Sequence, residues 1–221
     1  MLLSHRYRFI YTKTKKTAGT SVESYFEPFC MAEGEWTARH SREEYVSESG
    51  IIGLRRARPA STCRWWHHMP ASLIRKRVGE ETWQQYFKFC VVRNPYEKAV
   101  SAFYFRRGRT LGEDSSLATA RTEFEHWLAA KGPPMDKNKY LIQGQFCLDD
   151  VVRYESLREG LERICDRLGV AWEPDRLPSF KAGIRPPGIT AKDLYTEKSR
   201  EIVRQAYQFE LDYFGYSFPT E

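Results

Sequence analysis

The feature that most constrains the fold is a short strand-like run near the start of the chain, which leads through a loop of small and basic residues toward a helix. Residues 8–12 (RFIYT) form the run, and residues 15–21 (KKTAGTS) form the loop with two lysines and three hydroxyl side chains. A strand that turns tightly into a helix leaves backbone N–H groups unpaired and directs the positive end of the helix dipole at the turn. The sequence therefore predicts a strand–loop–helix unit that can hold a phosphate group.

The residues around the predicted helix start refine this interpretation. Thr20 is predicted to cap the helix, with Glu23 at the third helical position completing a capping box. Gly19 is expected to allow either a positive φ angle or a close approach of a ligand to the backbone. An NTPase P-loop needs the pattern G-x-x-x-x-G-K-[ST], whose last hydroxyl binds magnesium, and the loop lacks that pattern. The alternatives are a loop that cradles phosphate without a metal ion and a lysine-rich turn before an ordinary surface helix.

Composition limits the class of protein. The 221 residues are 41% hydrophobic and 14% aromatic, which predicts a single domain spanning 1–221. The net charge of +6 predicts an anionic partner such as a nucleotide, a nucleic acid, an acidic glycan or a membrane surface. The five cysteines are widely spaced and show no C-x-x-C or zinc pattern. Because no apolar run is long enough for a membrane span or a signal peptide, we expect a soluble, cytoplasmic protein with reduced thiols.

Strand-like and helix-like segments alternate along the chain. Further strands are predicted at 87–92, 151–154 and 61–66, and helices at 70–77, 94–107, 156–169 and 196–215. Asn94 and Ser156 are predicted N-caps, and the last helix has an apolar stripe of Ile202, Ala206, Phe209 and Tyr213. This order predicts an α/β fold with a mainly parallel central sheet, whose ligand crevice lies at the carboxyl ends of the strands.

A second motif follows the predicted strand 87–92. Arg93 stands at the strand-to-helix turn, and Ser101 lies two turns into the helix on roughly the side of Asn94 and Lys98. A guanidinium fork and a hydroxyl that converge on one spot suit a second phosphate. The alternative is a well-capped helix start without a binding role.

On these two motifs the sequence resembles the sulfotransferases that use 3′-phosphoadenosine 5′-phosphosulfate, especially the carbohydrate branch that includes the heparan sulfate 2-O-sulfotransferases. Residues 16–21 (KTAGTS) are similar to the 5′-phosphosulfate loop of that family, and residues 93–96 (RNPY) with Ser101 are similar to its 3′-phosphate motif. Residues 153–157 (RYESL) and 212–216 (DYFGY) also resemble pieces of the family. The resemblance implies a P-loop-like three-layer α/β fold, with helices flanking the sheet, and a donor bound by two anion sites at opposite ends of an adenosine.

The resemblance also implies roles for individual residues. Lys16 should be catalytic, because it contacts the 5′-phosphate and the bridging oxygen, where charge develops as the leaving group departs. Lys13 and Lys15 could also contact the donor or simply be solvated, and Phe180 is a candidate to stack on adenine. The expected donor-binding residues are Lys15, Lys16, Thr17, Ala18, Gly19, Thr20 and Ser21 in the loop, Arg93 and Ser101 at the 3′-phosphate, and Lys181 and Arg185 in a late loop that closes over the donor.

Removal of a proton from the acceptor requires a general base, for which histidine is the natural candidate. His68 matches the place of the catalytic histidine in the carbohydrate branch better than His67 does. The non-catalytic interpretation is a histidine pair packed beside two tryptophans. If neither histidine is the base, Glu43 or Glu44 is the alternative.

The predicted function is in-line transfer of a sulfuryl group from the donor to a hydroxyl, with adenosine 3′,5′-bisphosphate as product and no metal ion. A carbohydrate is the expected acceptor, read by residues 31–60 and 106–139, and a tyrosine residue or a small alcohol is the alternative. The competing functions are a nucleotide or small-molecule kinase with an atypical P-loop, disfavoured by the missing Walker lysine, and a basic nucleic-acid-binding module, disfavoured by the core-like spacing of the aromatics. We therefore expect a nucleotide donor and a hydroxyl acceptor as partners, without nucleic acid or stable membrane insertion.

Overall fold

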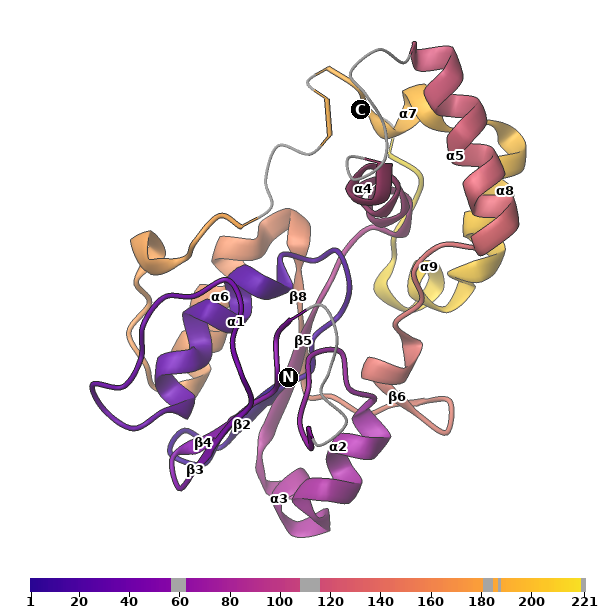
Figure 1. Cartoon of the computed structure of the whole chain (residues 1–221). Helices are drawn as coiled ribbons and strands as arrows, with labels where there is room; N and C mark the ends of the chain where they lie inside the picture. The colour runs from indigo at the N-terminus through magenta and orange to yellow at the C-terminus, as the bar shows by residue number, and fades with distance from the viewer. Residues whose placement is uncertain (57–62, 108–115, 181–184, 187, 220–221) are drawn as a thin grey trace. The chain divides into compact units, whose positions relative to one another are not determined.

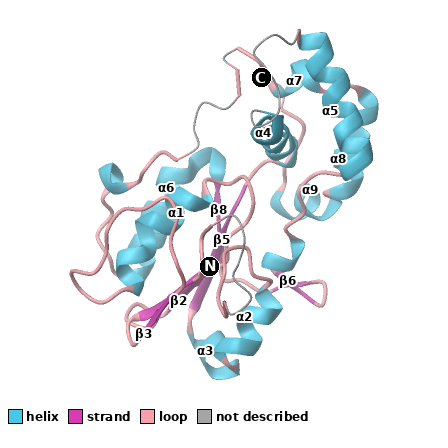
Figure 2. Ribbon diagram, in the orientation of Figure 1, coloured by secondary structure: helices cyan, strands magenta, loops and turns pink. Residues whose placement is uncertain are grey.

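The structure, a computed structural model, describes residues 1–56, 63–107, 116–180, 185–186 and 188–219 (Figures 1 and 2). The chain divides into two compact units. Unit 1 consists of Met1–Val92 and Asp136–Phe180, and unit 2 consists of Arg93–Met135 and Lys181–Glu221.

Unit 1 is built on a mixed β-sheet. Among the described residues, six strands pair in the order β3-β4-β1-β2-β5-β8. The strands are β1 (Leu2–Ser4), β2 (Phe9–Tyr11), β3 (Tyr45–Ser47), β4 (Gly50–Ile52), β5 (Phe87–Val92) and β8 (Asp150–Arg153). The β2–β5 and β5–β8 pairs are parallel, whereas β1–β2, β1–β4 and β3–β4 are antiparallel.

The prediction of a mainly parallel sheet is therefore wrong, because the first strands are connected as hairpins. Residues 5–8 join β1 to β2, and residues 48–49 join β3 to β4. A parallel pair needs a crossover of a dozen or more residues, so links this short permit only antiparallel pairing. Of the strand predicted at 61–66, residues 61–62 lie outside the described residues, and the rest contributes a single bridge between Leu54 and Trp66.

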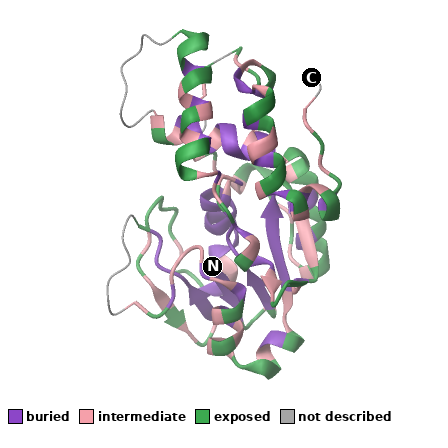
Figure 3. Ribbon diagram, turned by 90° about the vertical axis from the view of Figure 1, so that its right-hand side faces the viewer, coloured by how far each residue is buried: buried purple, intermediate pink, exposed green. Residues whose placement is uncertain are grey.

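Helices cover both faces of this sheet. Helices α1 (Gly19–Phe26) and α6 (Leu157–Leu168) share a core with one face, and Figure 3 shows the buried strands of the sheet in purple. Side chains in this core include Phe9, Tyr11, Val22, Phe26, Phe89, Val152, Leu161 and Ile164. Each fully buried Phe contributes roughly 1.5–3 kcal/mol relative to an exposed one.

The opposite face is marked by Lys88, which alternates with Phe87 and Phe89 along β5. Its Nζ donates to the carbonyl of Trp83 in α3 (Glu80–Gln85), and α3 follows α2 (Ala71–Val78) directly. Helix α2 corresponds to the helix predicted at 70–77, with both ends one residue later in the chain.

Short elements complete unit 1: η1 (Glu27–Cys30), η2 (Lys137–Lys139), the hairpin of β6 (Leu141–Ile142) and β7 (Gln145–Phe146), η3 (Tyr154–Ser156) and η4 (Pro174–Arg176). Helix α6 ends at Gly169, which adopts the left-handed conformation (φ 67°), as the predicted helix end requires. Ser156 occupies the N-cap position of α6 as predicted, but its side chain makes no capping hydrogen bond, because the 3₁₀ turn η3 leads into the helix.

Unit 2 is helical in its described residues. It contains α4 (Pro95–Arg107), α5 (Leu117–Lys131), α7 (Ala191–Leu194), α8 (Glu197–Ala206) and α9 (Gln208–Phe214), packed around an aromatic core. Asn94 caps α4 as predicted, because its Oδ1 accepts a hydrogen bond from the N–H of Tyr96 at 3.0 Å. Gly108, the predicted end of this helix, lies outside the described residues.

The helix predicted at 196–215 begins at the predicted cap Thr196 but is broken into α8 and α9 at Tyr207. The buried face is offset by one residue from the predicted apolar stripe on both sides of the break, and the prediction is wrong at Tyr213, which is 54% exposed. Val203, Tyr207 and Phe214 are buried instead.

Candidate functional site

The loop of residues 12–18 connects β2 to α1 and has an unusual backbone. Ala18, at the N-cap position of α1, is left-handed (φ 55°, ψ 20°), and its carbonyl accepts the N–H of Ser21 at 2.8 Å. Lys16 also has a positive φ of 61°. Residues other than glycine rarely adopt positive φ angles. This backbone conformation persists only where the surrounding structure holds it. The capping box predicted at Thr20 is wrong, because the left-handed turn starts the helix at Gly19 and places Thr20 inside it.

Buried polar side chains hold this backbone in place. Thr14 Oγ1 donates to the carbonyl of Val91 at the end of β5 and lies 2.8 Å from Thr17 Oγ1. The N–H of Lys15 donates to Asp136 Oδ2 at 2.8 Å, and Asp136 is fully buried. The loop conformation is therefore fixed by the protein itself, without the help of a ligand.

Gly19 is required for space rather than for its backbone angle. It is absent from the positive-φ residues, so the first of the two roles expected for it is wrong. A Cβ at this position would stand 2.9 Å from both Cγ and Cε of Lys13. Lys13 is only 4% exposed, which excludes the solvated interpretation, and its Nζ lies 2.5 Å from Glu23 Oε2. The sequence did not predict this ion pair. Because the carboxylate of Glu23 pairs with Lys13, it does not cap α1.

Glu23 belongs to a buried ionic network behind the loop. Arg55 contacts Glu23 Oε2 at 3.2 Å and also pairs with Glu27, which Arg42 approaches at 2.8 Å. Burial raises the pKa of Glu23, but the charges of Lys13, the terminal ammonium and Arg55 together hold it well below its usual value. The network joins the loop and α1 to residues 39–42, because Arg55 also donates to the carbonyls of Arg39 and His40.

The two adjacent histidines have the same hydrogen-bonding pattern. Nδ1 of His68 lies 3.0 Å from the carbonyl oxygen of Lys13, and Nδ1 of His67 lies 2.8 Å from that of Leu54. A carbonyl oxygen only accepts, so Nδ1 carries the proton in each ring and Nε2 carries the lone pair. Burial, and then the charge of Lys13, lower the pKa of His68 to about 3, and burial lowers that of His67. His68 is therefore a neutral imidazole at physiological pH.

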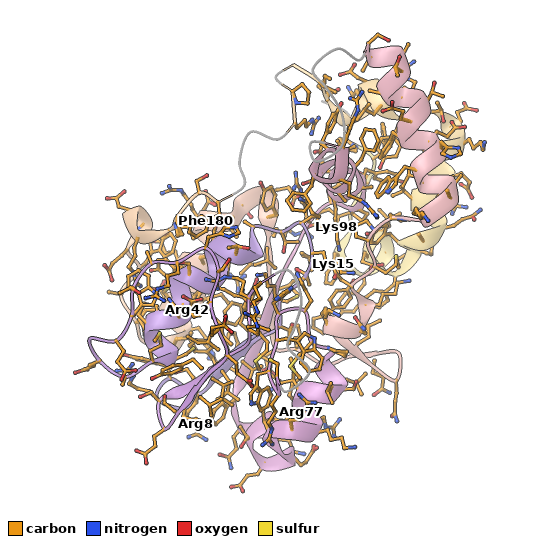
Figure 4. All side chains as sticks on the ribbon, viewed as in Figure 1. Arg8, Lys15, Arg42, Arg77, Lys98 and Phe180 are labelled. Atoms are coloured by element: carbon orange, nitrogen blue, oxygen red, sulfur yellow. The ribbon has the colours of Figure 1, made fainter. Side chains whose placement is uncertain are left out.

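Two further features lie close to these residues in unit 1. The N–H of Phe180 donates to Ser21 Oγ at 3.2 Å, and the Phe180 ring meets His40 edge-on at 5.5 Å (Figure 4). A pocket is lined by Arg39, Ser41, Arg42, Glu43, Glu44, Tyr45 and Arg56. Both alternative bases are engaged, since Glu43 pairs with Arg56 at 2.8 Å and Glu44 accepts the N–H of Trp65 at 2.6 Å.

In unit 2, two of the residues predicted for the 3′-phosphate, Arg93 and Arg185, are connected through Glu97. Its Oε2 lies 3.7 Å from a guanidinium nitrogen of Arg93 and 2.7 Å from one of Arg185. Ser101 stands one turn after Glu97 on the same face of α4. Lys181 lies outside the described residues. Sequence reasoning missed Glu97, although its i,i+4 spacing from both Arg93 and Ser101 could have indicated it.

The fold and the loop define an α/β protein in which a left-handed turn, held by buried hydrogen bonds, precedes a helix N-terminus. The chain belongs to the sulfotransferase family, whose profile matches residues 1–217. It is also similar to an uncharacterized protein of Archaeoglobus fulgidus, with 29% identity over 114 residues that cover 48% of this chain and 88% of that protein. No solved structure gives a significant match.

The described residues have two further general features. No helix in them is both long and apolar enough to cross a lipid bilayer. All five cysteines are described, and each is a free thiol.

Proposed function

We propose that this sulfotransferase uses 3′-phosphoadenosine 5′-phosphosulfate as its donor and transfers the sulfuryl group in line to an acceptor hydroxyl. The prearranged loop of residues 12–18 carries the proposal. It offers backbone N–H groups and the positive end of the α1 dipole next to Lys16, which suits a phosphosulfate. A P-loop-like arrangement that works without a metal ion is part of the same proposal.

The loop would bind the 5′ end of the donor. Lys16 offsets the negative charge that develops on the bridging oxygen as the S–O bond to the nucleotide breaks. Residues 15–21 supply the remaining N–H and hydroxyl groups, and adenosine 3′,5′-bisphosphate leaves as product. The buried cations behind the loop, Lys13, Arg42 and Arg55, outnumber the two carboxylates that they pair with, which favours an anion there.

The 3′-phosphate would be bound by Arg93, Ser101 and Arg185. We also propose Lys181 for this role, because of the family resemblance. The ion pairs with Glu97 hold the guanidinium groups of Arg93 and Arg185 in defined positions. Two guanidinium groups held close together by one carboxylate suit the binding of a dianion.

His68 is our proposed general base. Its Nε2 takes the proton of the acceptor hydroxyl as the oxygen attacks sulfur. The bond from Nδ1 to the carbonyl of Lys13 supports this role, because it leaves Nε2 with the lone pair. His67 has the same tautomer and is the alternative.

For the acceptor we propose a carbohydrate bound at the pocket lined by residues 39, 41–45 and 56. Its arginines, carboxylates and tyrosine supply donors and acceptors for several hydroxyl groups. The free cysteines agree with a cytoplasmic location, which we also propose.

The decisive experiment compares the melting temperature with adenosine 3′,5′-bisphosphate, with ATP plus magnesium, and with a DNA or RNA oligomer. We expect stabilisation by the bisphosphate alone, of about 2.7 kcal/mol when its concentration is a hundred times Kd. A shift with ATP and magnesium but none with the bisphosphate would reject the sulfotransferase donor and favour a kinase.

A further inference from the structure

We propose that Lys13 is a positioning residue for the base rather than a ligand of the donor. Glu23 holds the ammonium group of Lys13 against the first turn of α1. The backbone carbonyl of Lys13 orients the ring of His68. The inference rests on the proposed role of His68 as the base, and it assigns a function to a lysine that stands three residues before Lys16.

The side chain of Lys13 is turned into the protein. It runs directly past Gly19, where a Cβ atom would collide with Cγ and Cε at 2.9 Å. Its Nζ lies 2.5 Å from Glu23 Oε2, and Arg55 shares that oxygen at 3.2 Å. Glu23 has no exposed surface, so a lysine that swung out toward a ligand would leave a buried carboxylate with fewer counter-charges. The protein therefore holds this ammonium group away from solvent and from any ligand in the loop.

The backbone of Lys13 is fixed on both sides. The N–H of Thr12 donates to the carbonyl of Phe89 at 3.0 Å, and the hydroxyl of Thr14 donates to the carbonyl of Val91. With the side chain anchored as well, the carbonyl of Lys13 points in one direction and accepts Nδ1–H of His68 at 3.0 Å. His68 itself has a left-handed backbone (φ 59°), a conformation that this hydrogen bond helps to hold.

The position of Lys13 also affects the charge state of the ring. Among the described residues, the charged and titratable groups with the largest effects on His68 are Lys13, His67 and Glu23. The ammonium of Lys13 and the ring of His67 lower the pKa of His68, whereas the carboxylate of Glu23 raises it. Removal of the Lys13 charge should therefore raise the pKa of His68, and removal of the Glu23 charge should not.

The experiment uses the full chain with Lys13→Met, which keeps the apolar stem, and Glu23→Gln, which keeps the shape of the carboxylate. Lys76→Met on the exposed side of α2 is the matched control for the loss of one lysine. Nitrogen NMR of the histidine rings reads the tautomer and titration of His68, and calorimetry reads the affinity for adenosine 3′,5′-bisphosphate. The pH profile of kcat/KM reads the base in turnover.

We expect Lys13→Met to raise the pKa of His68 and to move the acidic limb of the kcat/KM profile to higher pH, with Kd for the bisphosphate within about twofold of wild type. Glu23→Gln should lower the fraction of the Nδ1–H tautomer without raising the pKa. Unfolding would instead move the pKa of His68 upward in both variants, so the two variants separate a specific effect from loss of structure.

A Kd that rises about tenfold or more in Lys13→Met, with an unchanged His68 titration, would show that Lys13 binds the donor and would overturn the inference. An unchanged titration with unchanged affinity would overturn it as well. If the wild-type protein failed to bind the bisphosphate at all, the proposed donor would be wrong, whereas the NMR comparison would still decide whether Lys13 controls His68.

Discussion

At the scale of single residues, the conformation of the loop of residues 12–18 depends on atoms that a motif pattern does not reveal. The glycine of the loop is needed because Lys13 passes over it, and the positive φ angles fall on Lys16 and Ala18 instead. A pattern of small residues predicts that the chain turns tightly here. It cannot predict which residue takes the left-handed conformation, because that depends on the buried contacts of Thr14 and Asp136.

Gly19→Ala should destabilise the protein by about 1–3 kcal/mol, because the added methyl group overpacks the stem of Lys13. Urea unfolding followed by circular dichroism measures this loss. Lys13→Ala in the same chain removes the colliding atoms, so the double variant should lose clearly less than the sum of the two single variants. Additive losses would contradict the packing explanation.

Two neighbouring roles can be separated by paired substitutions. Lys16→Ala should weaken binding of adenosine 3′,5′-bisphosphate about tenfold or more, since it removes a charged contact to phosphate. His68→Ala should leave this affinity nearly unchanged and lower kcat by about 100-fold or more, which is typical for loss of a general base. His126→Ala, at an exposed position of α5, is the control. Full turnover in His68→Ala would show that His68 is not the general base, and the base would then be His67 or another group.

At the scale of elements, the sequence predicted those parts of the fold that have a local signal. Strands β2, β5 and β8 and helices α2, α4 and α6 lie within two residues of their predicted bounds, because apolar runs, Asn94 and Gly169 mark them. Strands β1, β3 and β4 have three residues each and no pattern of their own. They exist because short hairpins extend the sheet, and the prediction of a mainly parallel sheet failed for that reason.

The candidate site divides in the same way. Lys16, Arg93 and Ser101 could be named from local motifs, whereas the Glu23–Arg55 pair joins residues 32 positions apart and leaves no local trace. The break at Tyr207 also lacks a signal, since neither glycine nor proline marks it. The Glu23–Arg55 pair depends on long-range contacts in the folded chain, and the structure gives no local cause for the break at Tyr207.

Helix α4 supplies the prediction at this scale. Arg93→Ala should weaken binding of adenosine 3′,5′-bisphosphate by roughly 1.5–3 kcal/mol, the usual value of a hydrogen bond to a charged group. Binding of adenosine 5′-monophosphate, which lacks the 3′-phosphate, should hardly change. Calorimetry with both nucleotides measures the difference, and Arg204→Ala on α8, which pairs with Glu201, serves as the control. Equal losses for both nucleotides would exclude Arg93 as the reader of the 3′-phosphate.

At the scale of the whole molecule, charge explains both the choice of partner and the sensitivity to acid. The net charge of +6 admits many anionic partners, and the family match reduces them to those of a sulfotransferase. Part of this charge is buried, because Lys13, Glu23 and Arg55 lie inside unit 1 beside two histidines whose pKa values are lowered by burial. The unfolded chain releases all these groups to water, so the pH dependence of stability reports on the interior of the site.

The free energy of unfolding should therefore fall as the pH drops below about 6.5, the ordinary pKa of histidine. In that range the unfolded state binds protons at His67 and His68, whereas native His68 binds one only near its pKa of about 3. Stability is lost wherever the unfolded state binds more protons. Glu23 has a lowered native pKa and an ordinary value of 4.5, so it adds to the loss only at lower pH. The buried terminal ammonium has a pKa lowered from 8.0, so its contribution overlaps the interval from about pH 6.5 to 5, and the share of His68 is found by comparison with a variant.

Urea titrations at several pH values across that interval measure the slope. His68→Gln keeps a polar side chain of similar size but cannot titrate, so its stability should decline less steeply than that of the wild type. His126→Gln, at an exposed site, should keep the wild-type slope. A His68→Gln slope equal to that of the wild type would mean that the imidazole of His68 is as basic in the folded protein as in water, and its proposed neutrality would have to be abandoned.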